Sequence, residues 1–323
     1  MFSAAVRGLC SRHLRRIVVR PPPVIGRSVH LTAYLTADKA SLSKLRKRTG
    51  YPFINCRKAL DRFENDVDKA EEWLRAEAQK EGWAKATKLQ HRAMSNGLIG
   101  LIVEGDAASI VELNCETDFV ARNKKFHALV QQVADACLRG GSTSNSDTRN
   151  IVAFDKSRIA SLPCDGAETV SDAIALVIGN IGENMAPRRG VVMRAADGFE
   201  LASYVHSAGP ESASSGACQL GKYCAVVSYR RTASPPDGAR FKTEELARQL
   251  CQHIVGMNPD RVGSPDDDDE PDSNKDDEKR LLFQEFLMDE SITVKEFLEQ
   301  NSLEISDFVK FQCGEQLPGD DLE

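Results

Sequence analysis

Two aliphatic, β-branched segments flank a short polar turn in residues 96–115, which read NGLIGLIVEGDAASIVELNC. Such segments are typical of β-strands, and the residues Glu104-Gly105-Asp106-Ala107 between them predict a hairpin. Farther along the chain, apolar residues recur at helical spacing from Phe126 to Cys137, and this pattern ends at Gly140-Gly141. The sequence therefore predicts an antiparallel hairpin that is covered by one amphipathic helix.

The second half of the chain repeats this pattern of strands and helices. Further helices are expected at residues 170–181, 242–257 and 293–300, and further strands at 190–196, 199–206, 220–229 and 307–313. Antiparallel strands with helices on one face form an α+β architecture. We expect two such subdomains, one in residues 96–150 and one in residues 151–315.

Residues 38–95 have a helical pattern instead. Two short helices are expected around Leu42 and Leu45 and from Phe53 to Phe63. Asp66 is suited to cap a third helix, whose helical character continues to about Met94. These residues predict a small three-helix module ahead of the sheet subdomains.

Charge is distributed unevenly along the chain. The formal net charge is −6, yet residues 1–37 contain six arginines and no acidic residue. An arginine-rich, acid-free start predicts a mitochondrial transit peptide, with a basic disordered arm as the alternative. The remaining body is acidic, which argues against binding to a nucleic-acid backbone. Nine acidic residues within 265–279 predict a disordered insertion at 260–279, and residues 316–323 predict a loose tail.

Several classes of function lack their usual signals. No apolar run approaches the roughly 18 residues that a membrane span needs. The nine cysteines include no Cys-x-x-Cys pair, and the six histidines show no metal-ligand spacing. The sequence also lacks a phosphate-binding loop and a nucleophile-elbow motif. We therefore expect no enzyme, metal or cofactor, and no nucleotide bound by this chain itself.

One segment at the exit of the predicted hairpin allows two interpretations. It runs from Asn114 to Val120 and contains Thr117, Asp118 and Phe119. Thr117 or Asp118 could cap the following helix while Phe119 folds into the core. Alternatively, the ring and the carboxylate project from a rigid corner and act on a partner protein. The residues alone leave both interpretations open.

Other segments accompany Asn114–Arg122 in a set order. They lie at residues 45–50, 56–60, 178–184, 188–189, 203–206, 286–288, 308–311 and 314–315. Together these segments resemble the elongation factor Ts family, the nucleotide exchange factors of elongation factor Tu. The resemblance covers residues 40 to 315 and, with the arginine-rich start, favours the mitochondrial branch. It implies that the amino-terminal module has a fold like that of ubiquitin-associated domains.

The resemblance also implies three sets of contacts with elongation factor Tu. Asp118 and Phe119 match the pair that inserts into the G domain near its magnesium site. In the amino-terminal module, the positions that match G-domain contacts are Arg46, Phe53 and Ile54. The positions that match contacts with the third domain are His206, Leu287 and Met288.

The implied function is guanine nucleotide exchange in the mitochondrial matrix. The partner would be mitochondrial elongation factor Tu, in a one-to-one heterodimer without nucleic acid or membrane. The bacterial pattern differs, because a helical hairpin is inserted there where this chain carries its acidic run, and the bacterial type dimerises.

Two alternatives come from other classes of function. The module at residues 40–80 could belong to an adapter that binds ubiquitin-like proteins, since Trp73-Leu74 and residues 50–53 suit that role. Cys115 could be the nucleophile of a thiol enzyme, although no histidine lies near it in the sequence.

Overall fold

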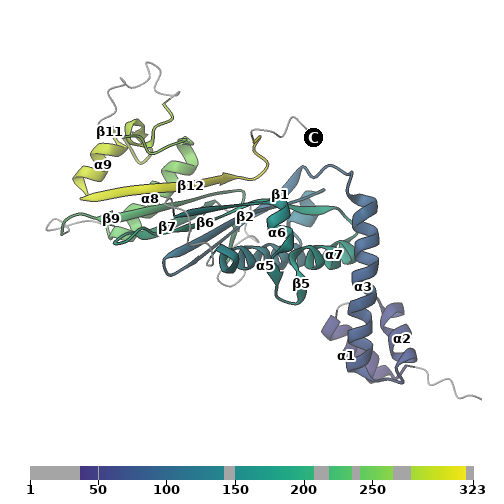
Figure 1. The fold of residues 1–323 in the computed structure, drawn as a ribbon. Coiled ribbons are helices and arrows are strands. Elements are labelled where there is room, and N and C mark those ends of the chain that lie inside the picture. Colours follow the sequence, from purple (N-terminus) through teal and green to yellow (C-terminus); the bar gives the residue numbers. More distant parts are fainter. Residues whose placement is uncertain are drawn as a thin grey trace, which may run out of the picture.

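The computed structural model describes residues 37–49, 51–141, 150–206, 218–234, 241–264 and 278–317, as a helical module joined to a two-sheet body (Figure 1). The expected transit peptide, apart from residue 37, lies outside the described residues, as do residues 265–277 of the insertion expected at 260–279 and residues 318–323 of the tail expected at 316–323. The helices are α1 (Lys39–Thr49), α2 (Phe53–Arg62), α3 (Val67–Leu89), α4 (Asp118–Ala121), α5 (Lys124–Gly141), α6 (Lys156–Ser161), α7 (Val170–Ile181), α8 (Thr243–Met257), the 3₁₀ turn η2 (Leu281–Phe283) and α9 (Val294–Gln300). The strands are β1 (Asn96–Glu104), β2 (Ala107–Cys115), β3 (Ile151–Asp155), β4 (Pro163–Cys164), β5 (Ala167–Thr169), β6 (Met185–Arg194), β7 (Glu200–His206), β8 (Gln219–Gly221), β9 (Tyr223–Arg231), β10 (Glu285–Phe286), β11 (Asp289–Thr293) and β12 (Leu303–Gln312).

The amino-terminal module consists of α1, α2 and the first half of α3. Its core holds Leu45, Leu60 and Leu74, which are almost completely buried. Asp66 caps α3 as expected, because its carboxylate accepts hydrogen bonds from the backbone N–H groups of Asp68 and Lys69, both at 3.1 Å. The module is therefore a small helical bundle that shares its third helix with the rest of the chain.

Helix α3 ends at Leu89, so the expectation that it continues to about Met94 is wrong. The carbonyl of Arg92 accepts a hydrogen bond from the Asn184 side chain at 3.1 Å, outside the helical ladder. Asn96 then pairs with Cys115 at the start of β1. Tertiary contacts with the sheet thus replace the helical hydrogen bonds that residues 90–94 would otherwise form.

The hairpin of β1 and β2 forms as predicted and lies near the middle of a five-stranded sheet of order β3-β6-β2-β1-β8. Gly105, at the first central position of its turn, has φ +57°, the backbone conformation that two-residue hairpins with glycine at that position require. Alternate residues face opposite sides, because Leu98 and Val111 pack toward α5 whereas Ile99 and Ile110 pack toward a second sheet. Both faces of the hairpin are therefore buried.

The expected boundary at residue 150 does not separate the two sheets. Strands β3, β6 and β8 all follow residue 150, yet they complete the sheet that β1 and β2 begin. Strand β6 pairs with β2 along its length, with a shift in register at Arg188. An apolar strand such as β2 would otherwise leave one edge unpaired, which makes this long-range pairing favourable.

The second sheet has the order β12-β9-β7 and completes a four-layer arrangement. Figure 1 shows α5 and α7 along one face of the first sheet, with the second sheet and α8 beyond its other face. On the far side of the second sheet, α8 packs through Leu246, Leu250 and Ile254. The α+β prediction is confirmed, with antiparallel sheets and helices on the outer face of each.

Candidate partner-binding surface

The corner after β2 presents an aromatic ring to solvent. Thr117 caps the one-turn helix α4 by accepting a hydrogen bond from the backbone N–H of Val120 at 3.3 Å. Val120 and Ala121 take the buried side of this turn. Phe119 lies on the opposite side and is 79% exposed. The interpretation in which Phe119 fills its own core is therefore wrong.

Asp118 stands beside this ring and does not cap the helix, since Thr117 has that role. Its carboxylate is half exposed and forms an ion pair with Arg122 at 3.0 Å, one helical turn away. Exposed pairs of this kind contribute only about 0.3–0.5 kcal/mol. The Asp118 carboxylate can therefore exchange Arg122 for groups of a partner at small cost.

The corner is braced from behind by the segment that follows α7. The Thr117 hydroxyl donates a hydrogen bond to the Glu183 carboxylate at 2.9 Å. In the reverse direction, the backbone N–H of Asn184 donates to the Glu116 carboxylate at 2.6 Å. These contacts fix the two residues that precede Asp118 and Phe119, so that the ring and the carboxylate project from a rigid support.

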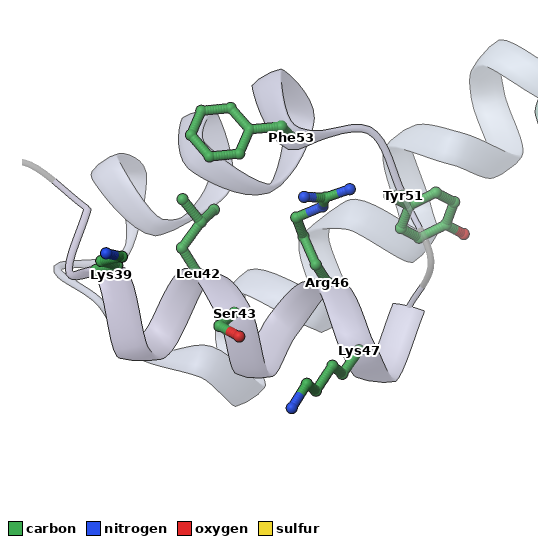
Figure 2. Close-up of a pocket in the computed structure, with 7 residues that line it drawn as sticks. All are labelled: Lys39, Leu42, Ser43, Arg46, Lys47, Tyr51 and Phe53. Atoms are coloured by element: carbon green, nitrogen blue, oxygen red, sulfur yellow. The ribbon is translucent and has the colours of Figure 1, made fainter.

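The amino-terminal module carries a second exposed cluster, beside a pocket of about 410 Å³. Figure 2 shows Arg46 and Leu42 extending from α1 toward the Phe53 ring on α2, whereas Lys47 extends away. The pocket is lined by Lys39, Leu42, Ser43, Arg46, Lys47, Tyr51 and Phe53. Phe53 is 48% exposed, and Ile54, next to it but outside the lining, is 76% exposed. An apolar surface rimmed by cations suits an apolar side chain that lies close to a carboxylate.

A third cluster lies on the second sheet and its neighbouring hairpin. His206 ends β7, is exposed, and lies 3.1 Å through its Nδ1 from the Tyr204 hydroxyl. The turn between β10 and β11 presents Leu287 and Met288, which are each a little less than half exposed. All eight residues expected from the sequence thus have solvent-accessible side chains, in three groups: on the module, on the corner after β2, and on the end of β7 with the β10–β11 turn.

Tyr223 also belongs to the third cluster, although the sequence analysis did not select it. It pairs directly with His206 across β7 and β9, and the two rings meet edge to face at 6.2 Å. Its side chain is partly exposed. The signal for Tyr223 was a polar aromatic residue at the start of an otherwise apolar strand, which is informative only once the strand pairing is known.

A buried histidine holds the turn that carries Leu287 and Met288. His253 on α8 is completely buried, and its Nδ1 accepts the backbone N–H of Leu287 at 3.1 Å. Its Nε2 lies 3.0 Å from the Gln284 side-chain oxygen, and its ring stacks on Phe286. With one nitrogen accepting and the other donating, the imidazole is neutral. Burial lowers the pKa of His253 to about 4.

We expect this buried imidazole to make the stability of the turn depend on pH. The folded pKa is about 4 against an ordinary value of 6.5, so the unfolded chain takes up the proton first as pH falls. The contribution of neutral His253 to the free energy of unfolding is present above about pH 6.5 and is lost as the pH falls toward 4. At pH 5 the loss amounts to about 2 kcal/mol. Urea unfolding at pH 7.5 and pH 5.0 measures it.

The matched variant is His253→Asn, which keeps a side-chain acceptor near Leu287 but does not titrate in this range. The loss of stability between pH 7.5 and pH 5.0 is expected to be about 2 kcal/mol smaller in this variant than in the parent. Equal losses in the two proteins contradict the assignment.

Three further findings on the described residues concern the reactivity of Cys115, metal binding and membrane spans. Burial raises the pKa of Cys115 to about 12, with Lys222 opposing the shift, so the group is a protonated thiol at neutral pH and a poor nucleophile. The described residues contain no cluster of three or more histidine, cysteine or acidic side chains that is suited to a metal. In the same residues, every helix is too short or too polar to cross a bilayer.

Comparisons with known proteins identify the family of this chain. The family model described as "Elongation factor Ts, mitochondrial, N-terminal" matches residues 26–84, and the model described as "Elongation factor TS" matches residues 116–271. A relative from Aedes aegypti named "Elongation factor Ts, mitochondrial" is 40% identical over 94% of this chain and 97% of its own length. Relatives of the same name from Drosophila melanogaster and Homo sapiens are each 42% identical, over 90% and 86% of this chain and 92% and 84% of their own lengths. The chain therefore belongs to the elongation factor Ts family, and to its mitochondrial type.

Proposed function

We propose that this chain is a guanine nucleotide exchange factor of the mitochondrial matrix, which binds elongation factor Tu carrying GDP and promotes GDP release and GTP loading. Family membership supports a role in translation elongation and in mitochondria. The observation that carries the finer proposal is the corner, where an exposed Phe119 ring stands beside a half-exposed Asp118 carboxylate. Among the residues that the structure describes, the Phe119 ring is left largely uncovered, which suits insertion into another protein.

The proposed mechanism is non-covalent. The Phe119 ring fills an apolar slot between two helices of the G domain, and the Asp118 carboxylate disturbs the groups that hold Mg²⁺ and the GDP phosphates. Loss of this electrostatic clamp weakens nucleotide binding by several kcal/mol. By linkage, bound nucleotide weakens the binding of the exchange factor by the same factor, so incoming GTP releases it. The chain itself needs no catalytic group, metal, cofactor or nucleotide for this step.

The other two clusters would hold the partner while the corner acts. Arg46, Phe53 and Ile54 contact the G domain, and the cationic rim of their pocket supports docking against an acidic, partly apolar surface. The second-sheet cluster of His206, Leu287 and Met288, extended by Tyr223, docks on the third domain. Because the partner is held at two distant points, insertion of the corner changes the conformation of the G domain and does not push the partner away.

The proposed complex contains one copy of each protein. The residues of all three proposed contacts are solvent-accessible in one chain, so a single copy presents all of them. Light scattering on the purified complex is expected to give the summed mass of one exchange factor and one elongation factor Tu. A mass near twice that value overturns the heterodimer.

The direct test of the proposed function is stopped-flow release of fluorescent GDP from purified mitochondrial elongation factor Tu. Adding this protein is expected to accelerate GDP release by orders of magnitude. Excess GTP is then expected to bind to elongation factor Tu in place of the released GDP. An unchanged release rate overturns the proposal. A pull-down with ubiquitin in parallel tests the adapter alternative, which the family membership does not favour.

A further inference from the structure

Helix α3 belongs to two parts of the molecule at once. Its first half packs through Ala70 and Leu74 into the core of the amino-terminal module. Its second half lies against α7 of the body, where Ala86 and Leu89 join the core of the first sheet. Figure 1 shows this helix running continuously from the module to the ends of α7 and β1. Its 23 residues span about 34 Å.

The backbones of α3 and α7 touch at one crossing. A Cβ atom on Gly82 would lie 2.1 Å from the carbonyl oxygen of Ala175, and one on Gly179 would lie 3.2 Å from the Cα of Gly82. Close approach of this kind fixes two helices firmly, because there are no intervening side chains whose rotamers could change. A side chain at Gly82 would force the helices apart.

One carboxylate ties the crossing together. At the start of α7, Asp172 forms a capping box with Thr169, in which one carboxylate oxygen accepts from the Thr169 backbone N–H at 3.1 Å. The same oxygen also accepts from the Thr169 hydroxyl at 2.8 Å. Its other oxygen accepts from the Gln79 amide at 2.7 Å and from the Trp83 indole N–H at 3.1 Å, both on α3. Burial opposes ionisation, but hydrogen bonds from Thr169, Gln79 and Trp83 outweigh it and hold the pKa of Asp172 below its usual value. The acceptor is therefore charged, which strengthens these bonds.

The C-terminal end of α7 leads directly to the segment that contacts the corner after β2, which carries Asp118 and Phe119. Gly182 ends the helix with φ +87°, and the next two residues, Glu183 and Asn184, are the ones that brace Thr117 and Glu116. A continuous set of packed contacts therefore runs from the module through α3 and α7 to Asp118 and Phe119. The path leaves helices and strands only at residues 116–117 and 182–184, and the hydrogen bonds between these two short segments hold them together.

From these contacts we propose that Asp172 is a positioning residue, which together with the Gly82 crossing holds the module's partner contact at a fixed angle to the Asp118–Phe119 corner. The inference rests on the proposed function, since both surfaces must engage one partner. We call the Gly82 crossing and the hydrogen bonds to Asp172 the joint. When the joint is rigid, binding at the corner already places Ile54 at its contact, and the module loses no further conformational freedom. A broken joint loses this preorganisation and the effective concentration that it gives.

The test is a double-mutant cycle between the joint and the module contact. Gly82→Leu breaks the crossing, and Ile54→Ala removes an exposed side chain of the module. Dissociation constants are measured against purified mitochondrial elongation factor Tu with GDP. In the parent, Ile54→Ala is expected to weaken binding about tenfold. In the Gly82→Leu background the same substitution is expected to change binding less than about twofold, because the module no longer reaches its contact.

Gly141→Ala is the matched control for general destabilisation. A Cβ there would lie 2.7 Å from the Val192 side chain, between α5 and β6 and not at the crossing of α3 with α7. In this background Ile54→Ala is expected to keep its full tenfold effect. Should Gly82→Leu fail to fold, Gln79→Leu combined with Trp83→Phe removes both donors to Asp172 and leaves the backbone crossing intact. The effect of Ile54→Ala is then expected to fall by at least about threefold.

The outcomes separate this inference from the function on which it rests. Equal losses from Ile54→Ala in all backgrounds overturn the positioning role and leave nucleotide exchange untouched. If Ile54→Ala does not weaken binding in the parent, Ile54 is not a contact of the module, and the positioning role of Asp172 is overturned with it. Absence of any binding by the parent refutes the proposed function itself.

Discussion

Replacing Asp118 and Phe119 together by alanine is expected to slow the GDP release that this chain stimulates by about 100- to 1,000-fold. The ring is 79% exposed and the carboxylate is half exposed, so their removal takes little from the chain's own packing. Nearly all of the loss should therefore appear in the partner complex. Stopped-flow release of fluorescent GDP from elongation factor Tu measures the rate.

Single variants divide this effect between charge and ring. Asp118→Asn keeps the size of the side chain and removes the charge that is proposed to disturb the metal site. Phe119→Leu keeps an apolar side chain and removes the ring. Phe241→Ala is the control, since Phe241 is an exposed aromatic residue outside the three clusters. If the double variant releases GDP as fast as the parent, the corner is not the exchange element.

The second large effect concerns stability and is expected for Glu112→Gln. Glu112 lies on β2 with no exposed surface, and its carboxylate pairs with Arg189 at 2.8 Å and Arg188 at 3.1 Å. It also accepts the backbone N–H of Gly314 at 2.8 Å. Removing one partner of a buried ion pair costs about 3–5 kcal/mol, because the remaining charges lose their compensation. Thermal unfolding should show a midpoint lowered by about 10 °C.

The control for this prediction is Glu304→Gln. Glu304 pairs with Arg230 at 2.7 Å, but both side chains are more than 40% exposed, so the expected cost is below about 1 kcal/mol. Similar midpoints for the two variants contradict the assignment of Glu112 as the buried centre of this network. The network also matters for architecture, because Arg189 reaches Glu315 beyond the end of β12 and so joins the two sheets.

Local patterns predicted much of the fold. The hairpin at residues 96–115 and the amphipathic helix α5 follow from the periodicity of apolar residues, which depends on near neighbours alone. The cap at Asp66 is equally local. The pairing of β2 with β6 is different, since it joins residues about 80 positions apart and left no local signal.

The candidate sites show the same division. A resemblance in sequence selected Phe119, but the sequence left its burial open, because a one-turn helix can turn either side to the core. His253 and Tyr223 received no weight from the sequence, since each gains its meaning from a residue on another element, Leu287 in one case and His206 in the other.

The sequence by itself determined the main helices and strands, the family and most residues of the proposed contacts, because periodicity and motifs depend on neighbouring positions. Only the tertiary structure decided that Phe119 faces solvent and that α3 is tied to α7 through Asp172. Those outcomes depend on which surfaces remain uncovered after distant strands and helices have packed, and close packing is a property of the whole chain.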